Sequence, residues 1–285
     1  MDMGYQGQQN QMNDLNQQGQ FQQSRASAVP QFPLEELKKY FAPKKSPKAG
    51  ITFLVIGILF CVGVLCNAPA LLVVGLPLIA IGVYLLANLQ PHSKITDEEY
   101  ERWVKAQLDV LIIKSLDKLD LDRNERGERK PLILRSFVLS PSGTLYTSDS
   151  VRWKIGKDGR PHFSVNVFTI FWKEDHHLAV YRGDVVALNP HAHTERTWEY
   201  FYTDIVGATT NDVQVSITIG KNQYPYRLRN FSMRVNSGES IDATVDADPI
   251  DNRQDLPRFH LPESGVDETL AQIRSLLREK KQTKM

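Results

Sequence analysis

The chain has 285 residues, a formal net charge of +1 and a hydrophobic fraction of 41%. A charge this close to neutral gives no support for nucleic-acid binding, which usually needs a strongly basic domain or stripe. Both cysteines, Cys61 and Cys66, lie in one apolar run, so the rest of the chain has neither a disulfide framework nor a cysteine metal site.

The chain begins with an arm, residues 1–31, that is rich in glutamine and asparagine. These two residue types make up twelve of the first 23 residues. Such a segment buries too little apolar surface to offset the entropy of ordering it, so we expect it to be disordered. Residues 32–50 follow as a basic juxtamembrane segment. Its lysines are expected to lie at a membrane surface: Lys38, Lys39, Lys44, Lys45 and Lys48.

Residues 51–90 contain an apolar run, Ile51 to Leu89, that has no charged side chain. As one helix its 39 residues would measure about 58 Å, nearly twice the roughly 30 Å of a hydrocarbon core. Two segments fit better, Ile51 to Cys66 and Ala70 to Leu89, with a turn at Asn67 to Pro69. The sequence therefore predicts a two-helix transmembrane hairpin, in which the short first segment either spans fully or is re-entrant.

Basic side chains flank this run on both sides and are absent from its turn. The positive-inside bias then predicts a multi-pass protein of a bacterial inner (cytoplasmic) membrane, with both termini in the cytoplasm. Gly57, Gly63, Gly75 and Gly82 would let two helices approach closely, although glycine is common in membrane helices anyway. Membrane lipid is an expected partner, and the hairpin allows a homo-oligomer.

Residues 95–122 are expected to form a connecting helix that leads into the cytoplasmic domain. Thr96 followed three residues later by Glu99 is a capping box. The apolar residues after it, among them Tyr100, Trp103 and Leu111, follow a helical period.

From Pro131 onward the apolar residues alternate with a period of two, as in "HFSVNVFTIF", "VQVSITIG" and "ESIDATVD", with turn signals between these runs. Residues 131–285 are therefore expected to form mainly an antiparallel barrel or sandwich. A final amphipathic segment, Val266 to Lys281, is expected to form a helix. Its apolar residues Leu270, Ile273 and Leu277 would close the open end of the barrel. The predicted fold class is a membrane α-hairpin plus an α+β cytoplasmic domain.

The stretch "TWEYFYTDIVGATT" adds a family resemblance. Tyr202, Asp204 and Ile205, followed by a single closing helix, resemble the pattern of bacterial pleckstrin-homology-like (PH-like) domains, which often lie beside a membrane hairpin. The resemblance covers roughly residues 131–282. It implies a PH-like barrel closed by a helix, and a binding or scaffolding module with no known reaction.

Two groups of residues are candidate binding sites. Four histidines, His176, His177, His191 and His193, could ligate a metal ion, or could simply be exposed turn residues. In "KNQYPYRLR", the basic residues Lys221, Arg227 and Arg229 are similar to the phosphoinositide-binding pattern of eukaryotic relatives, or are ordinary arginines on the wet face of a strand.

No glycine-rich phosphate loop, G-x-S-x-G or H-E-x-x-H motif occurs in the sequence. We therefore expect no enzyme, no catalytic residues and no cofactor. The predicted function is a membrane-tethered cytoplasmic binding or scaffold module that recognises a protein partner at the inner membrane. The alternatives are a lipid-headgroup-responsive or metal-responsive membrane sensor, and an enzyme of unrecognised class.

Overall fold

The computed structural model describes residues 32–42, 48–63, 71–87, 93–121, 130–141, 144–219, 222–250, 256–261 and 263–282. The arm predicted to be disordered, residues 1–31, lies outside them. The chain divides into two compact units. The smaller unit is Pro33–Ile95, and the larger unit is Thr96–Met285 together with Met1–Phe32.

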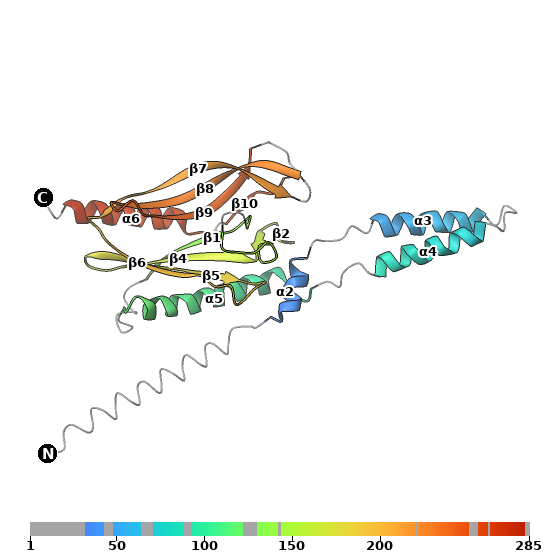
Figure 1. Cartoon of the computed structure of the whole chain (residues 1–285), viewed down its shortest axis with the longest axis horizontal. Coiled ribbons are helices and arrows are strands. Elements are labelled where there is room, and N and C mark those ends of the chain that lie inside the picture. Colours follow the sequence, from blue (N-terminus) through green and yellow to red (C-terminus); the bar gives the residue numbers. More distant parts are fainter. Residues whose placement is uncertain are drawn as a thin grey trace, which may run out of the picture. The chain divides into compact units, whose positions relative to one another are not determined.

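The described residues of the smaller unit form the helices α2 (Leu34–Tyr40), α3 (Lys48–Gly63) and α4 (Leu71–Ala87). Helices α3 and α4 pack side by side (Figure 1). A Cβ atom added at Gly57, Gly75 or Gly82 would come closer than 3.0 Å to atoms of the other helix. The close approach predicted at these three glycines is therefore confirmed. Because Gly57 faces Ile79 and Gly75 faces Cys61, the two helices run antiparallel.

The predicted transmembrane hairpin is wrong. Helix α3 has 16 residues and α4 has 17, so the helices are about 24 and 26 Å long, shorter than the roughly 30 Å of a hydrocarbon core. Among the residues that the structure describes, no helix is both long enough and apolar enough to cross a membrane. The predicted multi-pass topology and inner-membrane location are wrong for the same reason.

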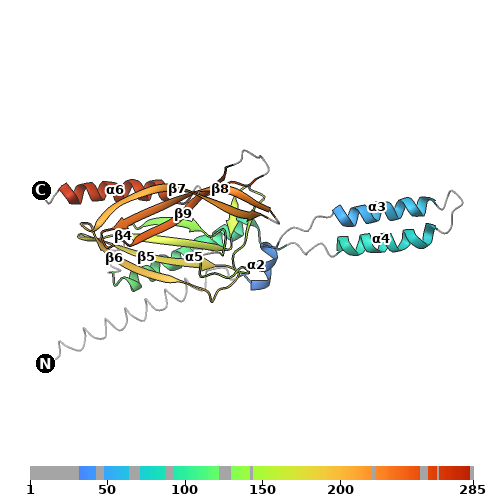
Figure 2. The same ribbon diagram turned by 45° about the horizontal axis from the view of Figure 1, so that its top comes forward.

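The larger unit contains two four-stranded antiparallel sheets and one two-stranded sheet (Figures 1 and 2). The first sheet has the order β1 (Leu132–Phe137), β4 (Val165–Lys173), β5 (His177–Val186), β6 (Glu195–Phe201). The second has the order β10 (Phe259–His260), β9 (Ser240–Pro249), β8 (Asn222–Val235), β7 (Ile205–Ile219). Strands β2 (Trp153–Ile155) and β3 (Pro161–Phe163) form the hairpin that makes the third sheet.

The predicted PH-like barrel is also wrong. A barrel requires an unbroken ladder of hydrogen-bonded strands around its circumference. Strands β6 and β7 follow one another in the chain, yet each is the last strand of its own sheet, and no described strand joins them. The described residues form instead three separate antiparallel sheets and the helices α2 to α6.

The main core lies between the two four-stranded sheets. Ile241, Ala243 and Val245 of β9 are all buried there, as their alternation in the sequence predicted. Helix α6 (Val266–Gln282) adds Leu270, Ile273 and Leu277 to the same cluster. Apolar burial on this scale is the principal stabilising contribution to the unit.

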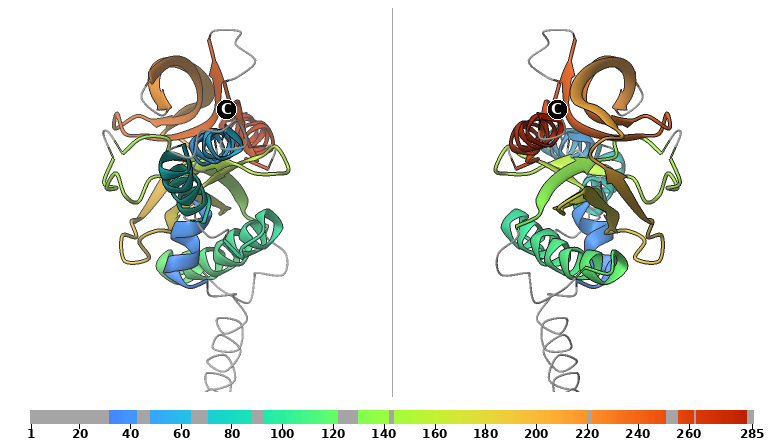
Figure 3. Two further views of the ribbon diagram at one scale, coloured as in Figure 1. Left: turned by 90° about the vertical axis from the view of Figure 1, so that its right-hand side faces the viewer. Right: turned by 90° about the vertical axis from the view of Figure 1, so that its left-hand side faces the viewer.

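Helix α5 (Asp97–Lys118) covers the face of the first sheet that points away from the second sheet (Figures 1 and 3). The predicted capping box at its start is confirmed, because the Thr96 hydroxyl accepts from the Glu99 amide and the Thr96 amide donates to Glu99 Oε2 at 2.8 Å. Trp172 Nε1 donates to Ser115 Oγ of α5 at 2.9 Å. Strand β4 is consequently buried on both faces, whereas the sequence pattern predicted one buried face.

Candidate functional site

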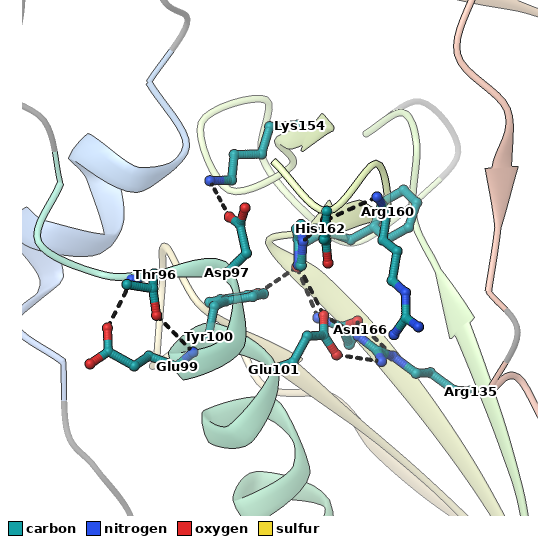
Figure 4. Close-up of polar contacts among 12 residues, drawn as sticks. Thr96, Asp97, Glu99, Tyr100, Glu101, Arg135, Lys154, Arg160, His162 and Asn166 are labelled. Carbon is teal, nitrogen blue, oxygen red and sulfur yellow. Dashed lines mark hydrogen bonds and ion pairs between the residues drawn. The ribbon is translucent and has the colours of Figure 1, made fainter. Parts of the chain in front are cut away.

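A group of charged side chains lies where the start of α5 meets the β2–β3 hairpin and β1 (Figure 4). We call it the acid–histidine cluster. Its members are Asp97 and Glu101 of α5, Arg135 of β1, Lys154 of β2, Asp158 of the β2–β3 turn, and His162 of β3.

Local sequence features place these residues. The capping box starts α5 at Asp97, and Glu101 lies one turn later on the same face because it is four residues on. Lys154 and His162 are directly opposite each other in the β2–β3 hairpin. The turn of that hairpin needs Gly159, whose φ of 77° lies in the left-handed region that favours glycine.

His162 is at the centre of the cluster and is fully buried. Its Nδ1 lies 3.0 Å from Glu101 Oε1, and its Nε2 lies 3.3 Å from Asp158 Oδ1. The Tyr100 ring packs edge-on against the imidazole, with the ring centroids 5.9 Å apart. The imidazole is therefore held between two carboxylates from different elements of the fold.

Glu101 is held by Arg135 as well as by His162. Arg135 Nη1 donates to Glu101 Oε2 at 2.8 Å, and Nη2 donates to Oε1 at 3.3 Å. Burial by itself raises the pKa of Glu101, but the hydrogen bonds from His162 and Arg135 outweigh this effect and lower the pKa to about 2. Glu101 is therefore ionised at neutral pH.

Asp97 is buried and accepts hydrogen bonds on both oxygens. Lys154 Nζ donates to its Oδ1 at 2.8 Å, and the Lys157 amide donates to its Oδ2 at 2.7 Å. The cluster thus contains three carboxylates against the two fixed cations Arg135 and Lys154. Its formal charge is −1 with a neutral imidazole, so it can accommodate a further positive charge.

A second feature is the outer edge of β7, which we call the β7 edge. Strand β7 is fifteen residues long and is the last strand of its sheet, and no other described strand pairs with this edge. Its sequence, IVGATTNDVQVSITI, has no lysine, arginine or proline, and Asp212 is its one charged residue. The last strand of the first sheet, β6, is shorter and carries Glu195, Arg196 and Glu199.

A shallow groove of about 580 Å³ lies between the start of β7 and α6. It is lined by residues 206–209 of β7 and by Arg274, Leu277 and Arg278 of α6. Arg274 Nε donates to the carbonyl oxygen of Ala208 at 3.0 Å, so α6 is fixed directly to the main chain of β7. The groove therefore combines apolar walls with two guanidinium groups beside an edge strand.

The structure does not bring the four predicted metal-binding histidines together. His176 and His177 lie where β5 begins, while His191 and His193 follow the end of that strand. A ten-residue strand separates the pairs by about 30 Å. In the part of the chain that the structure describes, the residues grouped so that they could hold a metal ion are Asp97, Asp158 and His162.

The basic residues predicted to bind a headgroup are accompanied by acidic ones. Arg227 and Arg229 are exposed on β8, whereas Lys221 lies outside the described residues. Arg229 Nη1 is 3.7 Å from Asp246 Oδ2, and Arg227 lies opposite Asp248 in the β8–β9 ladder. Headgroup binding stays a prediction, and the acidic neighbours weaken any attraction for a phosphate.

Two of the lysines predicted at a membrane surface form ion pairs with glutamates of their own helix. Lys38 pairs with Glu35 at 2.8 Å and Lys39 pairs with Glu36 at 2.6 Å, each within one turn of α2. Lys48 is the first residue of α3. Lys44 and Lys45 lie outside the described residues. Without a transmembrane hairpin, the fold gives their predicted membrane role no support.

No family model matches the chain, and no curated protein or solved structure matches it either. The functional argument therefore depends on the residues of this chain alone.

Proposed function

We propose that the larger unit is a protein-binding module that takes up an extended, acidic segment of a partner protein as an added strand on the β7 edge. The observation that carries this proposal is the β7 edge itself, which is fifteen residues long and has no lysine, arginine or proline.

Edge strands present unpaired amide and carbonyl groups, and proteins usually protect them with lysine, proline, bulges or short length. The β7 edge has two such features, both at its start: a register shift between Ile205 and Gly207, and the Arg274 side chain of α6, which donates to the Ala208 carbonyl oxygen. From Ala208 onward the strand pairs regularly with β8 and is rich in threonine, valine and isoleucine, which favour extended structure. These properties suit the addition of a strand, in which main-chain hydrogen bonds provide affinity.

The surroundings of β7 favour an acidic segment. Arg274 and Arg278 lie in the groove at the start of the strand, and Arg234 is exposed on the neighbouring β8. Basic groups around a binding edge attract an acidic partner and disfavour a basic one. In the same groove, Val206 is 60% exposed and provides an apolar contact for a side chain of the added strand.

The proposal can be tested with the full-length chain and a library of random ten-residue peptides. We expect the selected peptides to be rich in acidic and β-branched residues. Val213 is 39% exposed on β7, so Val213→Lys should leave the fold intact while placing a charge beside the edge. It should weaken peptide binding at least about tenfold. The matched control is Thr197→Lys on the edge strand β6, which should leave the affinity unchanged.

Equal affinities for the wild type and the Val213→Lys variant would contradict the proposal. So would a selection that yields basic peptides. A third outcome is that the full-length chain dimerises without peptide and that Val213→Lys abolishes the dimer. The occupant of the β7 edge would then be a second copy of the chain, and the proposed partner would be wrong.

A further inference from the structure

Three potential metal ligands converge within the acid–histidine cluster. Asp97, Asp158 and His162 each contribute one potential ligand atom, and the three atoms lie within 4.8 Å of one another. Asp97 and His162 are buried, whereas Asp158 belongs to an exposed turn. The group is therefore rigid on its inner side and open to solvent at the turn, which provides an entry path for an ion.

Acidic groups face both nitrogens of the His162 ring. Glu101 Oε1 lies 3.0 Å from Nδ1, and Asp158 Oδ1 lies 3.3 Å from Nε2. Asp97, the third carboxylate of the cluster, belongs to the same group of potential metal ligands. This arrangement of negative groups around one imidazole suits a bound cation.

The three ligand atoms converge on Gly156. A Cβ atom added to Gly156 would lie closer than 3.0 Å to Asp97 Oδ2, Asp158 Oδ1 and His162 Nε2. Any side chain at this position would therefore clash with all three atoms, so their approach to one another requires glycine here. The φ of this glycine is not in the left-handed region, so the backbone conformation does not itself require glycine.

We propose that Asp97, Asp158 and His162 form a binding site for a divalent transition-metal ion of the zinc class. One imidazole nitrogen and two carboxylate oxygens are ligands that zinc accepts, while magnesium and calcium prefer oxygen alone. Water would complete the coordination at the solvent-exposed side. The proposal goes beyond the binding function proposed above and is independent of the β7 edge.

The residues around the three ligands act as a supporting shell. Glu101 orients the His162 ring through Nδ1, as carboxylates commonly do for metal-bound histidines. Asp97 uses Oδ1 for Lys154, and the Lys157 amide fixes Oδ2 in position. A carboxylate oxygen has two lone pairs, so Oδ2 can accept this amide and still coordinate an ion.

The test measures Zn²⁺ binding to the full-length chain by titration calorimetry after treatment with a chelator. We expect one tightly bound equivalent. In the wild type, the Arg160 amide donates to Asp158 Oδ1 at 3.0 Å. Asp158→Asn removes the negative charge of the ligand but keeps a side-chain oxygen that can accept this hydrogen bond. The turn should therefore still fold. Affinity should fall at least about tenfold. Asp149→Asn is the control, since Asp149 is exposed and outside the cluster, and it should bind like the wild type.

A second variant, Gly156→Ala, places a methyl group against all three ligand atoms, so it should push them apart and weaken Zn²⁺ binding. A third variant replaces His176, His177, His191 and His193 together with asparagine and should retain the tight equivalent. Co²⁺ absorption provides a further readout, since its ligand-field bands should be lost in Asp158→Asn.

The proposal is overturned if Asp158→Asn and Gly156→Ala bind Zn²⁺ like the wild type. It is also overturned if the four-histidine variant loses the tight equivalent, because the result is then an adventitious ion only, held by surface histidines. Thermal unfolding of each variant without metal identifies any loss of affinity that comes from misfolding.

Discussion

Replacing Arg135 with methionine should destabilise the larger unit substantially. The guanidinium group donates to both oxygens of Glu101, at 2.8 and 3.3 Å, and its Nε and Nη2 donate to Asn166 Oδ1 at 3.1 and 2.9 Å. Methionine retains part of the apolar stem but cannot donate. The variant would leave the Glu101 carboxylate in place with His162 but without its second charged partner.

The magnitude follows from the environment of Glu101. A pKa of about 2 in place of 4.5 corresponds to about 3 kcal/mol of favourable interaction with the ionised form, to which the hydrogen bonds from His162 and Arg135 both contribute. Removing one member of a buried ion pair typically costs about 3 to 5 kcal/mol. We therefore expect Arg135→Met to lower the free energy of unfolding by about 3 kcal/mol, out of a total of roughly 5 to 15 kcal/mol.

Urea unfolding at pH 7 with a chelator, followed by tryptophan fluorescence, measures this effect, because all four tryptophans lie in the larger unit. The double variant Arg135→Met, Glu101→Gln should lose less unfolding free energy than the two single variants together. The reason is that glutamine removes the negative charge at position 101 that Arg135→Met leaves without its guanidinium partner. The exposed Arg196→Met is the control and should cost under about 0.5 kcal/mol. A loss below about 1 kcal/mol for Arg135→Met, or strict additivity of the pair, would refute this reasoning.

Two further predictions concern acid stability and the helix pair. Because the folded pKa of Glu101 is depressed to about 2, its contribution is fully present above about pH 5 and is lost as the pH falls towards 2. In Glu101→Gln, the free energy of unfolding by urea should therefore fall less steeply than in the wild type as the pH decreases from about 5 to 2. An unchanged dependence on pH would contradict this prediction. In a Cys66→Ser background, Gly75→Cys should form a disulfide with Cys61 on mild oxidation, since Gly75 faces the Cys61 sulfur. Val73→Cys, 75% exposed, is the control, and equal cross-linking of both variants by mass spectrometry would contradict the register of α3 and α4.

Features that depend on neighbouring residues were predictable from the sequence. The capping box needs only Thr96 and Glu99, which contact each other across three residues whatever the rest of the fold does. The burial of Ile241, Ala243 and Val245 follows from the two-residue period of a strand with one face in the core. Both predictions concern a single element.

Features that depend on distant residues were not predictable. Glu101 and His162 lie 61 residues apart and meet because α5 packs beside the β2–β3 hairpin, so no motif spacing indicates the acid–histidine cluster. Its one sequence signal is the Asp158-Gly159 turn, which predicts a hairpin but not what the hairpin contacts. Similarly, alternation within β4 could not show that α5 covers its second face.

The transmembrane hairpin was mispredicted for a different reason. The apolar run of 39 residues set the expected length of the two segments, but composition does not fix where a helix ends. Helix α3 begins earlier than expected, at Lys48, and α4 begins at Leu71. Among the described residues, neither helix is both long enough and apolar enough to cross a bilayer.

Amide hydrogen exchange tests the central claim, strand addition at the β7 edge, most directly. The full-length chain would be compared with and without a saturating acidic peptide taken from the library selection. We predict that protection increases in residues 208–219 of β7, because amides of an edge strand gain hydrogen-bond partners when a strand is added. Protection confined to β6 or to α6, with β7 unchanged, would contradict the account.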